Sequence, residues 1–246
     1  DTLVYIKSLD AGVNFWKVIS GSNIEIKSIA LNEPLINLIG LKDGKVNWDI
    51  TKPSASEPAS SSGSSDFNIA LKKYEIKNGN INYRDDALNY TLNLEQVNHT
   101  GNGDFTQDLF VLNTVTEIAK ASTSYGGVSY LYKTKTNLKV DLEMDMKNSK
   151  YTFKENEISL NDMLVKVDGW LAMPGNDINM DLKFSTPQND FKSFMSLIPG
   201  VYRDGFRDVK SSGTMAFNGF VKGTYNEKTM PGFGLNLKVE NGKFQD

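Results

Sequence analysis

The sequence predicts an all-β, mainly antiparallel fold: a large curved sheet, forming a groove or a partly open barrel, with one or two short helices. Three observations lead to this class. Apolar and polar residues alternate with a period of two over many segments, Asx-Gly pairs punctuate these segments, and only two short stretches have helical spacing. One-sided alternation is typical of antiparallel strands that have one dry and one solvated face.

The clearest alternation runs over residues 138–146, where charged residues occupy every second position. Residues 178–184 and 235–239 repeat this pattern. The apolar residues of these segments are the expected lining of a dry face: Leu138, Val140, Leu142, Met144, Met146, Ile178, Met180, Leu182, Phe184, Leu235, Leu237 and Val239. Such a face must be covered by a second sheet, by closure of the sheet on itself, or by a ligand, and the sequence leaves these alternatives open.

Asn-Gly and Asp-Gly pairs lie between or beside the alternating segments, beginning at residues 43, 78, 102, 168, 218 and 241. Both residues of such a pair tolerate positive φ, so the pairs predict hairpin turns or, as the alternative, bulges that redirect a strand. The pairs at residues 43, 78 and 241 also begin a short internal repeat of polar and apolar residues.

Helical spacing is clearest over residues 188–198, with Asn189 or Asp190 as the N-cap and Pro199-Gly200 as the stop. Its apolar face predicts a helix that closes one end of the groove: Phe191, Phe194, Met195 and Ile198. A shorter helical turn is expected over residues 14–19.

Residues 51–65 read TKPSASEPASSSGSS, a composition with nothing to bury, and we expect a flexible loop there. The residues before this loop are too few for a good core of their own, so residues 1–246 are expected to form a single domain. Both ends of the sequence read as strands, which indicates a segment of a longer chain or a mature form.

The composition argues against several classes of function. The chain has no cysteine, one histidine and a formal net charge of −3. Absence of cysteine excludes disulfides, zinc fingers, iron–sulfur clusters and thiol nucleophiles, and the slight acidity argues against a nucleic-acid surface. Nucleotide-binding and serine-hydrolase motifs are also absent from the sequence.

Other candidate groups have simpler interpretations. Asp141, Glu143 and Asp145 alternate with apolar residues, so they indicate a solvated strand face rather than a catalytic pair. His99 has no neighbouring nucleophile or carboxylate in the sequence and is expected to be structural. Three tryptophans at residues 16, 48 and 170 are compatible with a sugar platform, but aromatics are equally expected in β cores. We therefore expect no catalytic residues, no metal and no cofactor.

Several segments carry a resemblance to a known family. Residues 24–38, an Ile-rich strand, Pro34 and a second strand, are followed at 43–49 by a Gly, Asn and Trp turn. Together these resemble the N-terminal region of AsmA-family proteins. Residues 71–85 resemble the next hairpin of that family, and residues 185–199, 213–231 and 239–244 are similar to its later segments, so the resemblance covers most of the chain.

The resemblance implies a non-catalytic periplasmic protein of outer-membrane biogenesis, anchored to the inner membrane through an N-terminal segment. It also implies a hydrophobic β-groove for phospholipid transport between membranes, as in TamB and bridge-like lipid-transfer proteins. The expected partners are phospholipid and other envelope proteins. The alternative is a β-sandwich surface module that binds carbohydrate or protein.

Overall fold

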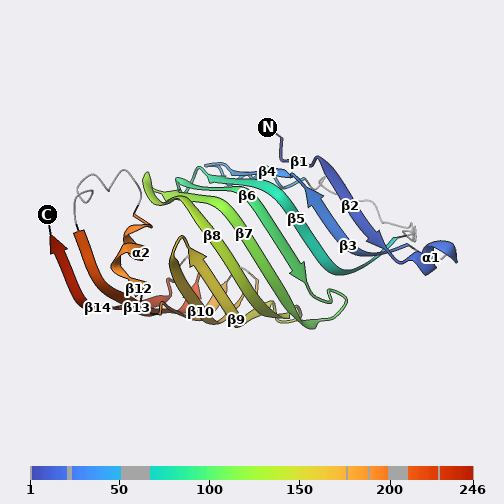
Figure 1. Cartoon of the computed structure of the whole chain (residues 1–246). Helices are drawn as coiled ribbons and strands as arrows, with labels where there is room; N and C mark the ends of the chain where they lie inside the picture. The colour runs from blue at the N-terminus through green and yellow to red at the C-terminus, as the bar shows by residue number, and fades with distance from the viewer. Residues whose placement is uncertain are drawn as a thin grey trace.

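The computed structural model describes residues 2–20, 24–50, 67–175, 177–187, 189–198, 210–226 and 228–245. Within these residues, fourteen strands join in one sheet, and two short helices accompany it (Figure 1). The elements are β1 (Val4–Tyr5), β2 (Ser8–Val13), α1 (Phe15–Ile19), β3 (Ile24–Asn32), β4 (Leu35–Gly40), β5 (Phe67–Asp85), β6 (Tyr90–Asn102), β7 (Leu109–Tyr125), β8 (Val128–Asp145), β9 (Lys150–Leu160), β10 (Met163–Ala172), β11 (Ile178–Ser185), β12 (Asn189–Asp190), α2 (Phe191–Met195), β13 (Lys210–Tyr225) and β14 (Gly232–Gln245).

Antiparallel pairing joins β5 to β11 in sequence order, and β13 and β14 continue the sheet beyond β11. The exception is at the N-terminal side, where β3 and β4 both pair parallel with β5. These two strands lie end to end, separated by Glu33 in a left-handed conformation and by the buried Pro34. Proline lacks a backbone N–H and therefore interrupts the ladder at this junction.

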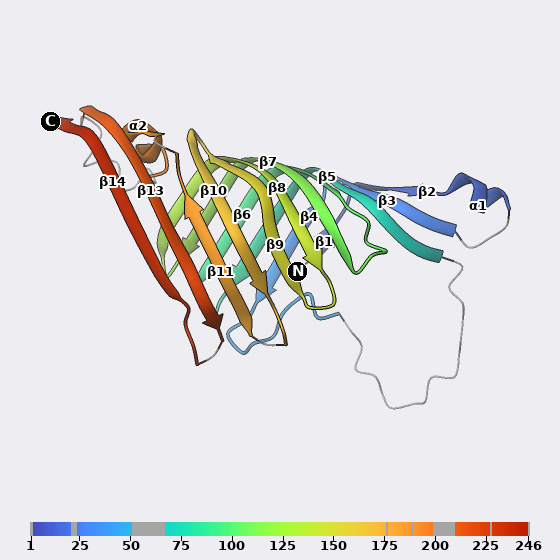
Figure 2. The ribbon, with the colours of Figure 1, turned by 90° about the horizontal axis from the view of Figure 1, so that it is seen from below.

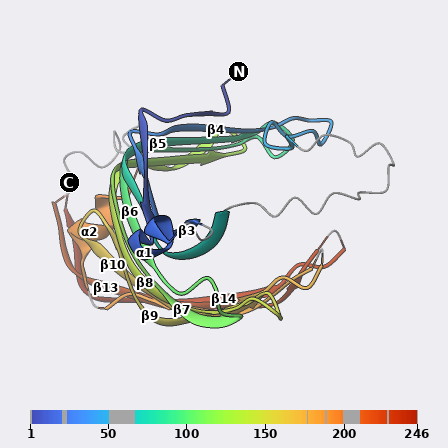
Figure 3. The ribbon, with the colours of Figure 1, turned by 90° about the vertical axis from the view of Figure 1, so that its right-hand side faces the viewer.

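The sheet curves strongly. Seen along its length, the ribbon has a C-shaped profile, with β4 and β5 in one arm and β13 and β14 in the other (Figure 3). From below, the strands from β6 to β14 lie obliquely side by side (Figure 2). The described strands do not close into a barrel, which agrees with the curved-sheet prediction and excludes the closed-barrel alternative for this part of the chain.

A line of β-bulges crosses the sheet and accounts for its bend. Left-handed residues occur at Glu33, Asn78, Gln96 and Lys133, beside one another in the β3–β4 junction, β5, β6 and β8. The β7–β8 register also shifts between Ile118 and Ala121. Each bulge inserts an extra residue and bends its strand, so neighbouring bulges bend the whole sheet along one line.

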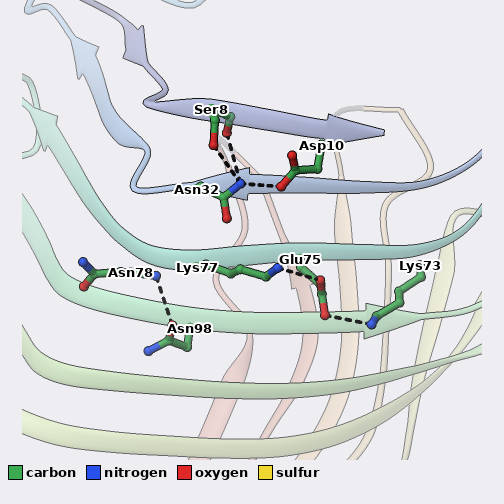
Figure 4. Close-up of polar contacts among 8 residues, drawn as sticks. All are labelled: Ser8, Asp10, Asn32, Lys73, Glu75, Lys77, Asn78 and Asn98. Carbon is green, nitrogen blue, oxygen red and sulfur yellow. Dashed lines mark hydrogen bonds and ion pairs between the residues drawn. The ribbon is translucent and has the colours of Figure 1, made fainter. Parts of the chain in front are cut away.

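Side chains replace the ladder hydrogen bonds that these bulges break. The Asn78 N–H donates to Asn98 Oδ1 over 3.0 Å, as Figure 4 shows. The Gln96 N–H donates to Asn80 Oδ1 over 3.2 Å. The Lys133 N–H donates to Ser122 Oγ over 2.9 Å. Because these backbone donors are satisfied, the bulges and the bend they produce are stable parts of the fold.

The small hydrophobic core lies beside this line of bulges. Val97, Ile118 and Ala121 are buried at 3%, 7% and 5% exposure. Half-buried residues of β5, β6 and β8 pack against them: Ile81, Leu94 and Leu138. A sheet of one layer buries few of its side chains. Its core therefore forms where the curvature of the sheet brings side chains of neighbouring strands together.

Several predicted turns are bulges instead. The Asx-Gly pairs that begin at Asn78, Asp168 and Asn241 lie inside β5, β10 and β14, at register shifts of the ladder, so the hairpin-turn prediction is wrong there and the bulge alternative is correct. The pair at Asn218 lies in a regular stretch of β13. The pair at Asp43 does form a turn, closed by the Gly44 N–H donating to Leu41 O.

Both predicted helices exist, although α2 is shorter than residues 188–198. Asp190 is its N-cap, and its side chain accepts from the Ser193 N–H over 2.8 Å. This bond is the largest cause of the lowered pKa of Asp190. The predicted flexible loop over residues 51–65 and the predicted stop at Pro199-Gly200 lie outside the described residues.

Candidate functional site

The predicted lining residues share one face of the sheet. Residues paired directly across strands point to the same side, so register alone establishes this. One row crosses seven strands from β7 to β14: Leu112, Leu142, Phe153, Gly169, Leu182, Val221 and Phe233. Every predicted lining residue falls on this face, the dry face hereafter, except Met146, which lies in the turn after β8.

The dry face also contains residues that the sequence pattern did not single out. A second row runs through Phe110, Met144, Tyr151, Leu171 and Met180. In β7 the alternation is hidden because Leu109 and Val111 on the opposite face are apolar as well, at 62% and 44% exposure. The signal that could have found this row is the register of β7 against the clear pattern of β8.

Burial differs between the middle of the dry face and its edge. Leu112, Val140 and Met163 are buried at 5–8% exposure, with neighbouring strands on both sides. In β14, Leu235 and Leu237 are 65% and 56% exposed, because among the described strands β14 pairs only with β13. The face is therefore dry in its centre and open at this edge.

Aromatic rings cluster on the dry face near the β6–β7 turn. Glycine makes room for them: a Cβ at Gly101 would lie 2.3 Å from the ring of Tyr74, and one at Gly103 would lie 2.8 Å from Phe110. The rings form a chain, with centroids 5.2 Å apart from His99 to Tyr74, 6.0 Å from Tyr74 to Phe105 and 4.9 Å from Phe105 to Phe110. This chain extends the apolar surface to the end of the strands.

The polar groups of the dry face are satisfied within the sheet. His99 Nδ1 lies 2.8 Å from Thr116 Oγ1, and burial lowers the pKa of His99, which keeps the ring neutral at pH 7. Thr114 Oγ1 donates to Val140 O over 2.8 Å. Thr136 Oγ1 donates to Thr134 O over 3.3 Å. These residues add little unmet polarity to an otherwise apolar surface.

Helix α2 lies against the C-terminal part of the dry face. Its Phe194 packs edge-on against Phe217 of β13, with ring centroids 5.8 Å apart, and Phe217 contacts Phe184 at 6.1 Å. In Figure 3, α2 lies inside the curve of the sheet. The other residues of the predicted end-closing set are half-buried with it: Phe191, Met195 and Ile198.

The carboxylates of β8 lie on the opposite, polar face, as expected for a solvated strand. Glu143 forms a 2.9 Å ion pair with Lys154 of β9. Asp145 accepts from Asn148, whose side-chain and backbone bonds are the largest causes of its lowered pKa. Within the described ranges, no group of three or more His, Asp or Glu side chains is arranged to hold a metal ion.

The three tryptophans do not form a common platform. Trp16 is in α1, and Trp48 follows β4 and lies 6.1 Å from Tyr83. Trp170 is in β10 on the polar face, where the Lys150 ammonium lies 4.7 Å from its ring centroid. This separation removes the main sequence feature that favoured a carbohydrate site.

Comparison with known proteins identifies the family. The model of the AsmA family, an envelope protein family, matches residues 1–198. Searches of curated proteins and of solved structures gave no match. In the described part of the chain, no helix has the length and apolar character needed to cross a membrane. Because the match covers most of its length, the chain belongs to the AsmA family.

Proposed function

We propose that this chain is a non-catalytic periplasmic component of outer-membrane biogenesis, whose dry face shields the acyl chains of phospholipids as they move between membranes. The single observation that carries the proposal is the cross-strand row of six apolar side chains and Gly169 over seven strands of a sheet that has no second sheet against it among the described residues. Membership of the AsmA family supports the association with the envelope.

Curvature supports assigning the dry face to the inside of the C-shaped profile. Side chains converge on a concave surface and diverge on a convex one, so the concave face of a one-layer sheet is the more buried. In β7, Leu112 and Ile118 on the dry face are 7% exposed, whereas Leu109 and Val115 on the polar face are 62% and 52% exposed. The packing of α2 on the same side agrees with this assignment.

The dimensions and energies suit an acyl chain. Seven strands about 4.8 Å apart give a row roughly 29 Å long, which accommodates an extended palmitoyl chain. Each buried methylene contributes about 0.8 kcal/mol, so a palmitoyl chain would gain about 11 kcal/mol on a fully dry surface. Shape and apolar area supply this binding, and no charged or nucleophilic group is required.

The β-sandwich alternative receives no support from the described residues. A sandwich needs two stacked sheets, whereas the described strands belong to one. A carbohydrate platform needs clustered exposed aromatics, whereas the tryptophans lie on separate elements. Lipid shielding is therefore the better supported of the two functions.

Charged substitutions on the open edge of the dry face test the proposal without burying a charge. Leu235→Asp/Leu237→Asp changes residues that are 65% and 56% exposed, so the fold should tolerate it. The matched control is Leu109→Asp/Val115→Asp, at 62% and 52% exposure on the polar face. The readouts are phospholipid retained in native mass spectrometry and transfer of labelled phosphatidylethanolamine between vesicles.

We expect the dry-face variant to retain and transfer less phospholipid than the wild type, and the control variant to match the wild type. Equal losses in both variants would point to general effects of charge. Absence of phospholipid binding and transfer in the wild-type chain would overturn the proposal.

A further inference from the structure

The tip formed by α1 exposes an unusual concentration of apolar side chains. Phe15, Trp16, Val18 and Ile19 are 65%, 76%, 46% and 61% exposed. Helix α1 lies at one extreme end of the molecule, beyond the rest of the sheet (Figures 1 and 2). The adjoining strand β2 adds Leu9 at 57% and Val13 at 46% exposure.

The backbone of this tip is held firmly while its side chains stay in water. The Asn14 N–H donates to Glu25 O over 3.0 Å, and the Asn14 side chain donates to Glu25 Oε2 over 3.4 Å, which ties the start of α1 to β3. The Val18 N–H donates to Asn14 O over 3.2 Å. Phe15 and Trp16 contact each other edge-on at 5.7 Å, so the exposed rings form one unit.

The size of the tip argues for a lipid surface over a protein partner. From their exposed fractions, the four α1 side chains leave roughly 500 Å² in water. A stable protein interface buries about 800 Å² per partner and requires complementary shape. A bilayer interface requires neither, and it favours tryptophan and phenylalanine.

The charge of the tip indicates which kind of bilayer it fits. Over residues 8–32 the sequence has two lysines, Lys17 and Lys27, and two acids, Asp10 and Glu25, so the region is neutral overall. Asp10 accepts a 2.6 Å hydrogen bond from Asn32, as Figure 4 shows. Without a basic patch, attraction to anionic headgroups is weak, and contact must come from apolar insertion.

We infer that α1 is a membrane-contacting tip, which inserts Phe15, Trp16, Val18 and Ile19 into the interfacial region of a phospholipid bilayer. Zwitterionic phosphatidylcholine suffices for this contact, and salt changes it little. The inference goes beyond the proposed function and does not depend on it, because a bilayer contact at α1 stands whether or not the dry face holds lipid.

The test uses vesicles of phosphatidylcholine that has brominated acyl chains, which quench tryptophan at the interface. In a Trp48→Phe/Trp170→Phe background, Trp16 is the one remaining tryptophan of the chain. We expect its fluorescence to be quenched on adding vesicles, equally at low and high salt. In the chain with Trp48 and Trp170 intact, Phe15→Ala/Trp16→Ala should lower the vesicle-bound fraction at least about tenfold in co-sedimentation.

Met230→Ala is the matched control, because Met230 is also 76% exposed but lies in the β13–β14 connection. It should bind vesicles like the wild type, and so should Leu235→Asp/Leu237→Asp, which separates tip contact from acyl shielding. Absence of quenching, or equal vesicle binding by the α1 variant and the wild type, would overturn the inference. A dimer that dissociates on Phe15→Ala/Trp16→Ala would also overturn it, by making a second copy the occupant.

Discussion

Gly169 is the residue whose replacement tests the architecture of the dry face most sharply. It lies in the central cross-strand row, between Phe153 of β9 and Leu182 of β11, with φ of +113°. A Cβ built there would lie 1.9 Å from the Asp181 carbonyl oxygen and 3.1 Å from the Leu182 Cα. Both atoms belong to the backbone of β11, so Gly169→Ala must displace that strand.

Gly175→Ala is the matched control. Gly175 also has positive φ, +68°, but a Cβ added there would have nothing within 4 Å. Its replacement adds about 1–2 kcal/mol of backbone strain, offset by about 0.4–1 kcal/mol from lower entropy of the unfolded chain. The net destabilisation should be about 1.5 kcal/mol or less. Gly169→Ala has the same kind of backbone strain and also disrupts the pairing of β10 with β11, so its total destabilisation should be about 3–5 kcal/mol.

Urea unfolding followed by tryptophan fluorescence measures both variants, with Trp170 as a reporter adjacent to the site. We expect the urea midpoint to fall much further for Gly169→Ala than for Gly175→Ala, corresponding to a difference in the free energy of unfolding of at least about 1.5 kcal/mol. Equal shifts for the two variants would refute the close β10–β11 approach on which the central row depends.

Three further predictions concern the core, a bulge and pH. Ile118 is 7% exposed, so Ile118→Ala should destabilise the fold by about 2–5 kcal/mol. Val115 lies on the opposite face of the same strand and is 52% exposed, so Val115→Ala should change the free energy of unfolding by no more than about 0.5 kcal/mol. Chemical denaturation measures both variants. Asn156 bridges the point where the β9–β10 ladder is broken: its Oδ1 accepts from the Val167 N–H over 2.6 Å, and its Nδ2 donates to Val167 O. Asn156→Ala should therefore destabilise the fold by about 1–3 kcal/mol. An unchanged free energy of unfolding in the same assay would contradict this role. Burial lowers the pKa of His99 in the folded chain, so the imidazole binds a proton more readily in the unfolded chain. Stability should therefore be lost as the pH falls below about 6.5. Thermal melts at pH 7 and pH 5 should show this loss in the wild type and a smaller loss in His99→Gln.

Much of the fold follows from the sequence because the period of alternation is a local signal. The alternation at residues 138–146 and 178–184 identified strands whose dry faces the ladder then joined. Asp190 as the cap of α2 was also predictable, since a short acidic side chain before an apolar helical face is itself local.

What the sequence did not reveal depends on contacts between strands. Asn78-Gly79 is compatible with a turn or a bulge, and only its position beside Gln96 and Asn98 decides for a bulge. The parallel pairing of β3 and β4 with β5 requires a crossover that no local pattern encodes. The exposure of α1 likewise depends on how few of the described elements pack against it, which the residues of α1 do not themselves specify.

The most direct test of the central claim is photo-crosslinking from two adjacent positions of β8. Leu142 lies on the dry face and Glu143 on the polar face, and both are half-buried. A benzophenone amino acid replaces either Leu142 or Glu143. Each variant chain is incubated with labelled phospholipid vesicles and then illuminated. We expect strong labelling of the chain from position 142 and little from position 143. Equal labelling from both positions, or none from position 142, would contradict the assignment of the dry face as the surface that shields acyl chains.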